Sequence, residues 1–195
     1  MILERIESPQ DIKRLNYKEL KLLAQEIRKL IVEVVSKKGG HLASSLGAVE
    51  LCLALHYCLD TPSDSLIFDV GHQAYAHKII TGRREKFYQL REHKGLSGFP
   101  NPEESEYDLF ISGHASTAIS WALGVAEAGR IKGKSTNTVA VVGDGSLSGG
   151  MCFEALNKCG ELKSDVLVIL NHNQMSISVS VGALSKYLTK LSLIH

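Results

Sequence analysis

The stretch from residue 139 to residue 173, VAVVGDGSLSGGMCFEALNKCGELKSDVLVILNHN, decides the fold of this 195-residue chain. Its first four residues, VAVV at 139–142, are apolar and predict a buried strand, which breaks into a glycine-rich turn at 143–150. A helical pattern follows, and a second apolar run at 166–170 ends on NHN at 171–173. Strand, helix and strand in this order predict neighbouring parallel strands in an α/β sheet.

Two polar residues, Asp144 and Asn173, follow the predicted strands. The carboxyl ends of parallel strands meet at one edge of a sheet, where ligands bind. Carboxylate and amide oxygens suit Mg²⁺, which takes few protein ligands and leaves room for a substrate phosphate. The glycines let backbone N–H groups approach a phosphate closely. The pattern therefore predicts a Mg²⁺–diphosphate site, although an isolated Gly-Asp-Gly turn more often only caps a helix.

Three further segments carry a family resemblance. They are GGHLASSLG at 39–47, DVGHQAYAHK at 69–78 and SGHAST at 112–117. Together with the Gly-Asp-Gly turn and the closing asparagine, they resemble 1-deoxy-D-xylulose-5-phosphate synthase, a thiamine-diphosphate enzyme. The resemblance runs from about Ser8 to about Leu191 without large gaps. Transketolases share the Gly-Asp-Gly turn but carry different glycine–histidine segments, which makes the resemblance specific.

The resemblance implies a role for each matching residue. It assigns Mg²⁺ to Asp144, Asn173 and the backbone carbonyl of Met175. His41 and His114 are expected to transfer protons at the reacting carbons, since the pKa of histidine lies near neutral pH. The residues expected to bind thiamine diphosphate are His72, Gly113, His114, Ala115, Gly145, Ser146 and Asn173.

At three positions the chain departs from the pattern that it resembles. Ala115 stands where serine is usual, which removes a hydroxyl contact but keeps the backbone contacts. His172 and Gln174 replace residues that are usually acidic around Asn173. These changes lower the negative charge beside the metal, so we expect weaker Mg²⁺ binding.

The resemblance also implies an activity. The family condenses pyruvate with D-glyceraldehyde 3-phosphate, releasing carbon dioxide, with thiamine diphosphate and Mg²⁺ as cofactors. This transferase reaction is the first step of non-mevalonate isoprenoid (terpenoid) biosynthesis, and its product also feeds thiamine biosynthesis. The full-length enzyme is expected to be a homodimer.

Members of the family are much longer than this chain. Residues 1–195 are therefore expected to form a single, incomplete thiamine-diphosphate-binding domain, without the pyrimidine-binding and C-terminal domains. The glutamate that activates the cofactor comes from the second domain, so the isolated chain is expected to be inactive. The alternative is a catalytically inactive truncated homologue that keeps only a diphosphate- and Mg²⁺-binding fold.

The rest of the chain predicts an α/β fold with an open, mostly parallel sheet flanked by helices. Apolar residues recur at helical spacing over residues 17–36, and SPQD at 8–11 is typical of a helix start. The other expected elements are helices at 48–58 and 117–128, a strand at 66–68 and a long loop at 92–108.

Composition narrows the class of protein. A formal net charge of +1 argues against a surface for nucleic acid or anionic membrane. No apolar run reaches the roughly 20 residues needed to span a bilayer. The start, MILERIES, carries acids and no apolar signal core, so we expect a cytoplasmic protein. Four cysteines form no CxxC pair and are expected to be buried thiols rather than disulfides: Cys52, Cys58, Cys152 and Cys159.

Other motifs are weaker. Gly133-Lys134-Ser135 resembles the end of a P-loop but lacks the first glycine and follows a helix instead of a strand. GDGSLS resembles a dinucleotide fingerprint, but no acid ends the next strand. His72 and His77 lack a third ligand for zinc. The histidines expected to be structural or on the surface are His56, His77, His93, His172 and His195.

Overall fold

The computed structural model describes residues 1–172, together with Ala183 and Lys190. Two predicted metal ligands, Asn173 and Met175, lie outside the described residues, and so do Gln174 and His195.

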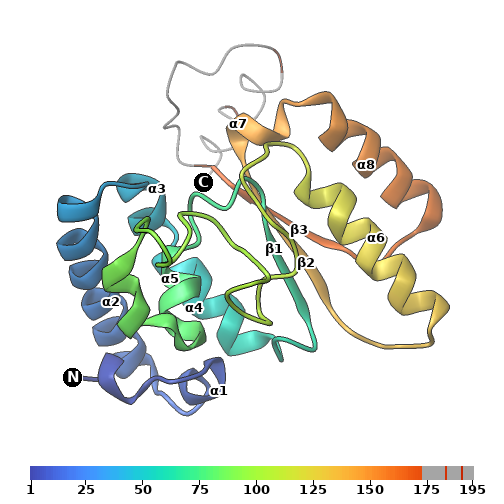
Figure 1. Ribbon diagram of the computed structural model, residues 1–195. Coiled ribbons are helices and arrows are strands. Elements are labelled where there is room, and N and C mark those ends of the chain that lie inside the picture. Colours follow the sequence, from blue (N-terminus) through green and yellow to red (C-terminus); the bar gives the residue numbers. More distant parts are fainter. Residues whose placement is uncertain (173–182, 184–189, 191–195) are drawn as a thin grey trace.

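Three parallel strands form one sheet in the order β1–β2–β3 (Figure 1). The strands are β1 (Ser65–Phe68), β2 (Thr138–Gly143) and β3 (Leu167–Asn171). The α-helices are α1 (Pro9–Ile12), α2 (Tyr17–Lys38), α3 (Leu42–Gly47), α4 (Val49–Cys58), α5 (Tyr75–Lys78), α6 (Ala118–Ile131), α7 (Asp144–Leu147) and α8 (Gly150–Leu162). Short helical turns lie at η1 (Leu3–Arg5), η2 (Ile79–Arg83) and η3 (Glu85–Gln89).

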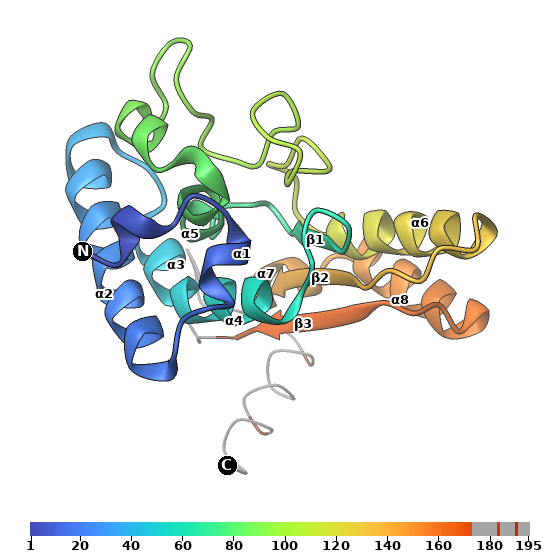
Figure 2. The same cartoon turned by 90° about the horizontal axis from the view of Figure 1, so that it is seen from below.

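The sheet is covered on both faces. Side chains along a strand point alternately to the two faces. Phe68, Val139 and Val141 belong to the core on the side of α2 and α4, whereas Ala140 and Val142 pack with residues of α6 and α8. Figure 2 shows the sheet between these two groups of helices. The continuous apolar pattern of β2 thus reflects burial on both faces, as is usual for parallel strands.

Most of the predicted elements are confirmed. The predicted strands and longer helices are present, with boundaries within three residues of those expected, and the start at Ser8 forms a capping box with Asp11. Helices α3 and α5 were not predicted, because four to six residues are too few for a periodic pattern. The expectation of a buried Cys58 is wrong. Its side chain is exposed at the last residue of α4, on the outer surface of that helix.

A buried hydrogen-bonded chain joins α4, α5 and the long loop after η3. His56 Nδ1 lies 3.0 Å from Thr61 Oγ1, and His56 Nε2 lies 2.9 Å from His77 Nδ1. His77 Nε2 lies 2.8 Å from Asp108 Oδ1, and both carboxylate oxygens of Asp108 accept from the Arg83 guanidinium at 2.5 and 3.0 Å. Every ring nitrogen of His56 and His77 therefore has a partner, which confirms their prediction as structural residues.

Burial decides the charge states in this chain of groups. It lowers the pKa of both His56 and His77, and the Arg83 charge lowers both further, while Asp108 opposes the shift at His77. The Asp108 carboxyl itself is buried, but His77 and Arg83 hold its pKa well below the usual range. The two imidazoles are thus neutral and the carboxylate is ionised at neutral pH.

A second buried carboxylate fastens a loop to the end of β1. Asp69 follows β1 directly and is fully buried. Its Oδ1 accepts from the Ser116 amide at 2.9 Å and its Oδ2 from the Ala118 amide at 3.0 Å. Ala118 is the first residue of α6, so Asp69 holds both the start of that helix and the Gly113–Thr117 loop before it.

The first prediction concerns pH. The free energy of unfolding should fall as the pH drops below about 6.5, because His56 and His77 stay neutral when folded but take up protons when unfolded. Each can contribute up to about 1.4 kcal/mol per pH unit. Urea unfolding at pH 7.5 and 5.5 should show a smaller pH dependence in His56→Gln than in the wild type. His93→Gln, at an exposed position, is the matched control. Its free energy of unfolding at both pH values should equal that of the wild type. An unchanged pH dependence in His56→Gln would contradict this account.

The second prediction compares the aspartates at the two ends of β1. Asp69→Ala and Asp64→Ala should each cost about 1–3 kcal/mol, since each leaves backbone amides without an acceptor. Only Asp69→Ala should speed hydrogen exchange at the amides of Ser116 and Ala118. Equal protection of these two amides in both variants would show that Asp69 does not hold the loop.

Candidate functional site

The carboxyl ends of β2 and β3 bring Asp144 and His172 together. Gly143 at the end of β2 pairs with Asn171 at the end of β3, so the residues that follow them are neighbours. Asp144 Oδ2 lies 2.8 Å from His172 Nδ1, and Asp144 Oδ1 accepts from the Gly145 amide at 2.8 Å. The predicted adjacency of the two strand ends is confirmed. His172, predicted to be a structural or surface residue, is part-buried, and its ring contacts the candidate metal ligand.

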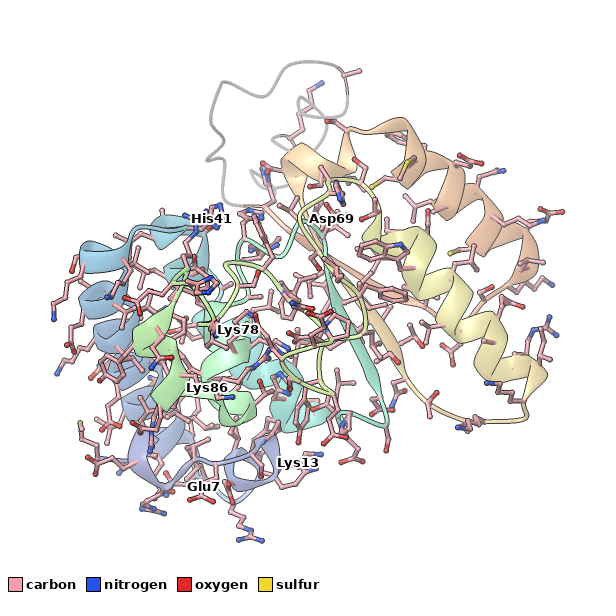
Figure 3. All side chains as sticks on the ribbon, viewed as in Figure 1. Glu7, Lys13, His41, Asp69, Lys78 and Lys86 are labelled. Carbon is pink, nitrogen blue, oxygen red and sulfur yellow. The ribbon has the colours of Figure 1, made fainter. Side chains whose placement is uncertain are left out.

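His41 and His72 form the second part of the site, at the end of β1. Their ring centroids lie 5.9 Å apart, and the His41 ring lies 5.2 Å from that of Phe99. The His41 amide donates to the Tyr75 hydroxyl at 3.2 Å. Gly40 permits this approach, because it has a φ of +135° and a Cβ there would collide with the Tyr75 hydroxyl. Figure 3 shows His41 at the same end of the molecule as Asp69.

The loop that carries His72 is strained and held by polar contacts. Val70 has a φ of +59°, a conformation that is unfavourable for a β-branched residue. The His72 carbonyl accepts from the hydroxyls of Ser44 at 3.1 Å and Ser45 at 3.0 Å. The next side chain, Gln73, accepts through Oε1 from the side-chain Nδ2 of Asn171 in β3 at 2.7 Å. The loop is therefore connected both to α3 and to the end of β3.

The segment Gly113-His114-Ala115 is exposed and precedes a residue, Ser116, that contacts α7. The Ser116 hydroxyl donates to the Ser146 carbonyl at 2.7 Å, which links this segment to α7. The His114 carbonyl accepts from the Thr117 hydroxyl at 3.0 Å. The structure thus places His114 at the edge of the site through its backbone, whereas His41 and His72 are in direct ring contact.

Burial favours the neutral form of two imidazoles of the site, those of His41 and His72. It lowers the pKa of His41, and the neighbouring His72 and Arg91 lower it further. It also lowers the pKa of His72, although the charge of Asp69 opposes that shift. A neutral imidazole can accept a proton near neutral pH, as a general base requires.

Unsatisfied polar atoms gather at this edge. In the described part of the chain, six buried side-chain atoms lack a hydrogen-bond partner, and four of them belong to His41, His72, Gln73 and His172. Leaving such an atom unpaired costs about 1–3 kcal/mol, so buried polar groups are normally paired. The clustering of unpaired nitrogens around the strand ends indicates a place built to receive a polar ligand.

Sequence reasoning missed three contributors to the site: Asp69, Tyr75 and Ser116. All three lie inside the quoted glycine–histidine segments, but nothing in local spacing shows which backbone groups their side chains will meet. The sequence did place His172 beside the metal, as a departure from the family pattern, but it did not indicate the contact with Asp144.

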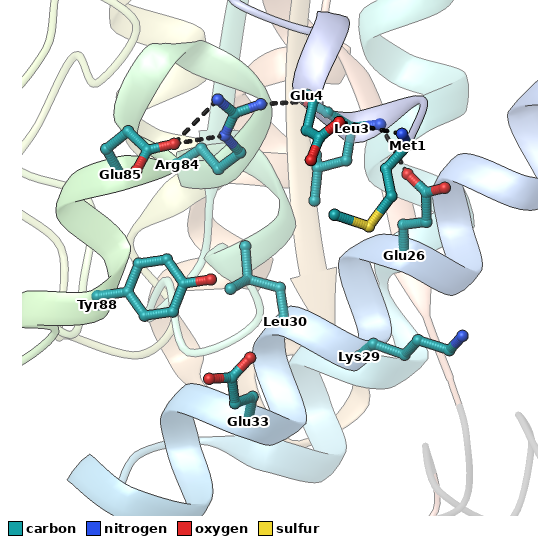
Figure 4. Close-up of a pocket in the computed structure, with 10 residues that line it drawn as sticks. All are labelled: Met1, Leu3, Glu4, Glu26, Lys29, Leu30, Glu33, Arg84, Glu85 and Tyr88. Atoms are coloured by element: carbon teal, nitrogen blue, oxygen red, sulfur yellow. Dashed lines mark hydrogen bonds and ion pairs between the residues drawn. The ribbon is translucent and has the colours of Figure 1, made fainter.

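A pocket of about 350 Å³ lies between η1, α2 and η3, away from the strand ends (Figure 4). Among its lining side chains Arg84 pairs with Glu85, and none of the predicted site residues lines it. Of the helices described, none is long and apolar enough to cross a membrane. Among residues 1–172, no three His, Cys, Asp or Glu side chains cluster as metal ligands.

Solved structures with the same fold are transketolases. The enzyme from Campylobacter jejuni superposes with a TM-score of 0.73 at 22% identity, covering 86% of this chain and 30% of that chain. The enzyme from Leishmania mexicana gives 0.71 at 20% identity, covering 87% and 30%. At such identities the likeness shows the fold alone, and it confirms the predicted open parallel sheet with flanking helices.

The chain's sequence relatives are more specific. The family model described as 1-deoxy-D-xylulose-5-phosphate synthase matches residues 3–194. The protein of that name from Thermomicrobium roseum is 57% identical over 192 residues, and the one from Thermus thermophilus is 54% identical over 193. These alignments cover 98% and 99% of this chain but only 30% and 31% of the relatives. The chain, which spans about a third of its relatives' length, belongs to the 1-deoxy-D-xylulose-5-phosphate synthase family.

Proposed function

We propose that the protein carrying this chain condenses pyruvate with D-glyceraldehyde 3-phosphate to form 1-deoxy-D-xylulose 5-phosphate. The observation that carries the proposal is the group of unpaired buried nitrogens on His41, His72, Gln73 and His172, at the strand ends. The relatives bear the name of this activity, and the family depends on thiamine diphosphate. We propose that the full-length protein acts as a cytoplasmic homodimer on these small substrates.

The residues present fit a Mg²⁺-bound diphosphate. Asp144 offers a hard carboxylate oxygen at the end of β2, as Mg²⁺ prefers. Asn173 and the Met175 carbonyl are proposed to complete the protein ligands. The unpaired Nδ1 of His72 is available to the diphosphate. The other proposed diphosphate contacts come from the Gly113-His114-Ala115 segment and from Gly145 and Ser146.

The proposed chemistry divides between the cofactor and the protein. Thiamine diphosphate, when bound, supplies the carbon that adds to pyruvate and holds the electron pair left by carbon dioxide. His41 has a part-buried ring whose pKa is lowered and whose buried Nδ1 is unpaired in the described residues, which suits it to accept a proton from a substrate hydroxyl and return it. His114 is proposed as the second proton-transfer group. Burial around Phe99 and Tyr75 limits water access to the His41 side.

The alternative function is a diphosphate-binding homologue without catalysis. The contact of His172 with Asp144 supports this alternative. It places an imidazole at a position where a negative charge would strengthen Mg²⁺ binding. Binding and turnover must therefore be measured separately.

The third prediction tests binding. In calorimetric titration, the chain should bind thiamine diphosphate only with Mg²⁺ present, and Asp144→Ala should weaken binding at least about tenfold, or about 1.4 kcal/mol. Asp165→Ala removes an exposed carboxylate just before β3, at the opposite edge of the sheet, and should bind as the wild type does. Equal affinities of the two variants for thiamine diphosphate would show that Asp144 is not part of the binding site.

The fourth prediction tests catalysis in a full-length setting. Residues 3–194 of this chain replace the matching segment of the Thermus thermophilus relative. The resulting chimera should form product from pyruvate and D-glyceraldehyde 3-phosphate. His41→Asn should lower kcat by about 10²–10⁴ with little change in cofactor affinity, whereas His72→Asn should mainly weaken cofactor binding. His93→Asn, at an exposed position, is the control. A folded chimera that binds cofactor without turnover would favour the inactive alternative.

A further inference from the structure

His172 is fixed beside the candidate metal ligand by the sheet itself. The pairing of Gly143 with Asn171 leaves Asp144 and His172 at adjacent strand ends. Their side chains are mostly buried, with 12% and 17% exposed, so the contact is sheltered from solvent. Asn171, one residue earlier, is already engaged with Gln73, which leaves His172 as the partner of the Asp144 carboxylate among the described residues.

The geometry of the contact between His172 and Asp144 is compatible with a hydrogen bond and also with both side chains binding one metal ion. A separation of 2.8 Å between His172 Nδ1 and Asp144 Oδ2 is that of a hydrogen bond. It is also close to the separation of about 3.0 Å between neighbouring ligands of an octahedral ion with bonds of about 2.1 Å. Nδ1 donates when it carries the ring hydrogen and offers a lone pair when that hydrogen sits on Nε2. An ion bound by Asp144 Oδ2 therefore meets a nitrogen ligand without a large movement of either side chain.

The second ring nitrogen of His172, Nε2, is free to take the hydrogen from Nδ1 within the described structure. His172 Nε2 is buried and has no hydrogen-bond partner within residues 1–172. Neither tautomer is locked by a second contact there, in contrast to His77, whose two ring nitrogens are both engaged. The hydrogen of His172 can move to Nε2 without breaking another bond of the described structure.

The chemical type of the ligand atom determines which ions bind more tightly. Mg²⁺ is a hard ion that prefers oxygen and gives up its waters reluctantly. Imidazole nitrogen suits first-row transition ions, whose affinity rises from Mn²⁺ through Co²⁺ to Ni²⁺. An imidazole beside Asp144 therefore raises the affinity for Co²⁺ more than the affinity for Mg²⁺.

We propose that His172 joins Asp144 as a ligand of the diphosphate-bound ion and makes this site prefer a first-row transition ion to Mg²⁺. The inference rests on the proposed function, since it uses the same metal site. In this proposal His172 determines which metal ion the site prefers, and the proposed contacts with the diphosphate stay the same.

The test is a titration of the 195-residue chain with Mg²⁺ and with Co²⁺, each in the presence of thiamine diphosphate, followed by calorimetry and by the visible spectrum of Co²⁺. The variant is His172→Asn, whose amide can still donate to Asp144 but is a poor ligand for Co²⁺. The preference for Co²⁺ over Mg²⁺ should fall by about 10–100-fold, and the Co²⁺ spectrum should change. His93→Asn removes an exposed imidazole and should change neither readout.

Two results would overturn the inference. If His172→Asn keeps the wild-type ion preference and Co²⁺ spectrum, His172 only positions Asp144, and the proposed function stands as long as binding still depends on Asp144. If neither ion supports thiamine diphosphate binding by the wild-type chain, the metal site proposed for this chain fails, and turnover by the full-length chimera then decides the proposed function. A loss of Co²⁺ preference with Mg²⁺ binding retained supports the assignment of His172.

Discussion

Parallel pairing of β1, β2 and β3 is the constraint on which the candidate site depends. The register pairs Phe68 with Val141 and Gly143 with Asn171, so all three strands end at one edge. The residues that follow them arrive there from positions about 100 residues apart in the chain. A slip of one residue would turn each strand's side chains to the other face and would misplace the contact between Asp144 and His172. The buried cores on both faces prevent that slip.

The same edge carries two residues with unfavourable backbone conformations. Val70 and Ser116 both have a positive φ, of +59° and +69°, and each lies within two residues of a glycine–histidine segment's functional position. Such conformations persist only where the surroundings hold them. Here the Asp69 carboxylate binds the loop of Ser116, and the hydroxyls of Ser44 and Ser45 bind the loop after Val70. The rigid α/β core thus supports loops that would not keep these shapes alone.

The buried histidines separate into two groups by their hydrogen bonds. His56 and His77 have partners for both ring nitrogens and connect α4, α5 and the long loop. His41, His72 and His172 each leave one ring nitrogen unpaired in the described part of the chain. Burial separates the two groups as well, since His56 and His77 are 0% and 1% exposed, whereas His41, His72 and His172 are only part-buried. The satisfied pair serves the fold, and the unsatisfied three face the place where a ligand is proposed to bind.

The sequence by itself determined the strands, the long helices, the family and the position of Asp144 after β2, because these depend on local periodicity and on contiguous motifs. Only the tertiary structure decided that Asp69 holds the start of α6, that Cys58 is exposed and that His172 contacts Asp144. Each of these depends on which distant segment packs against a side chain, and no pattern within one helix or strand contains that information. The long-range pairing of strands sets the partners of these side chains, and with them the chemistry available at the site.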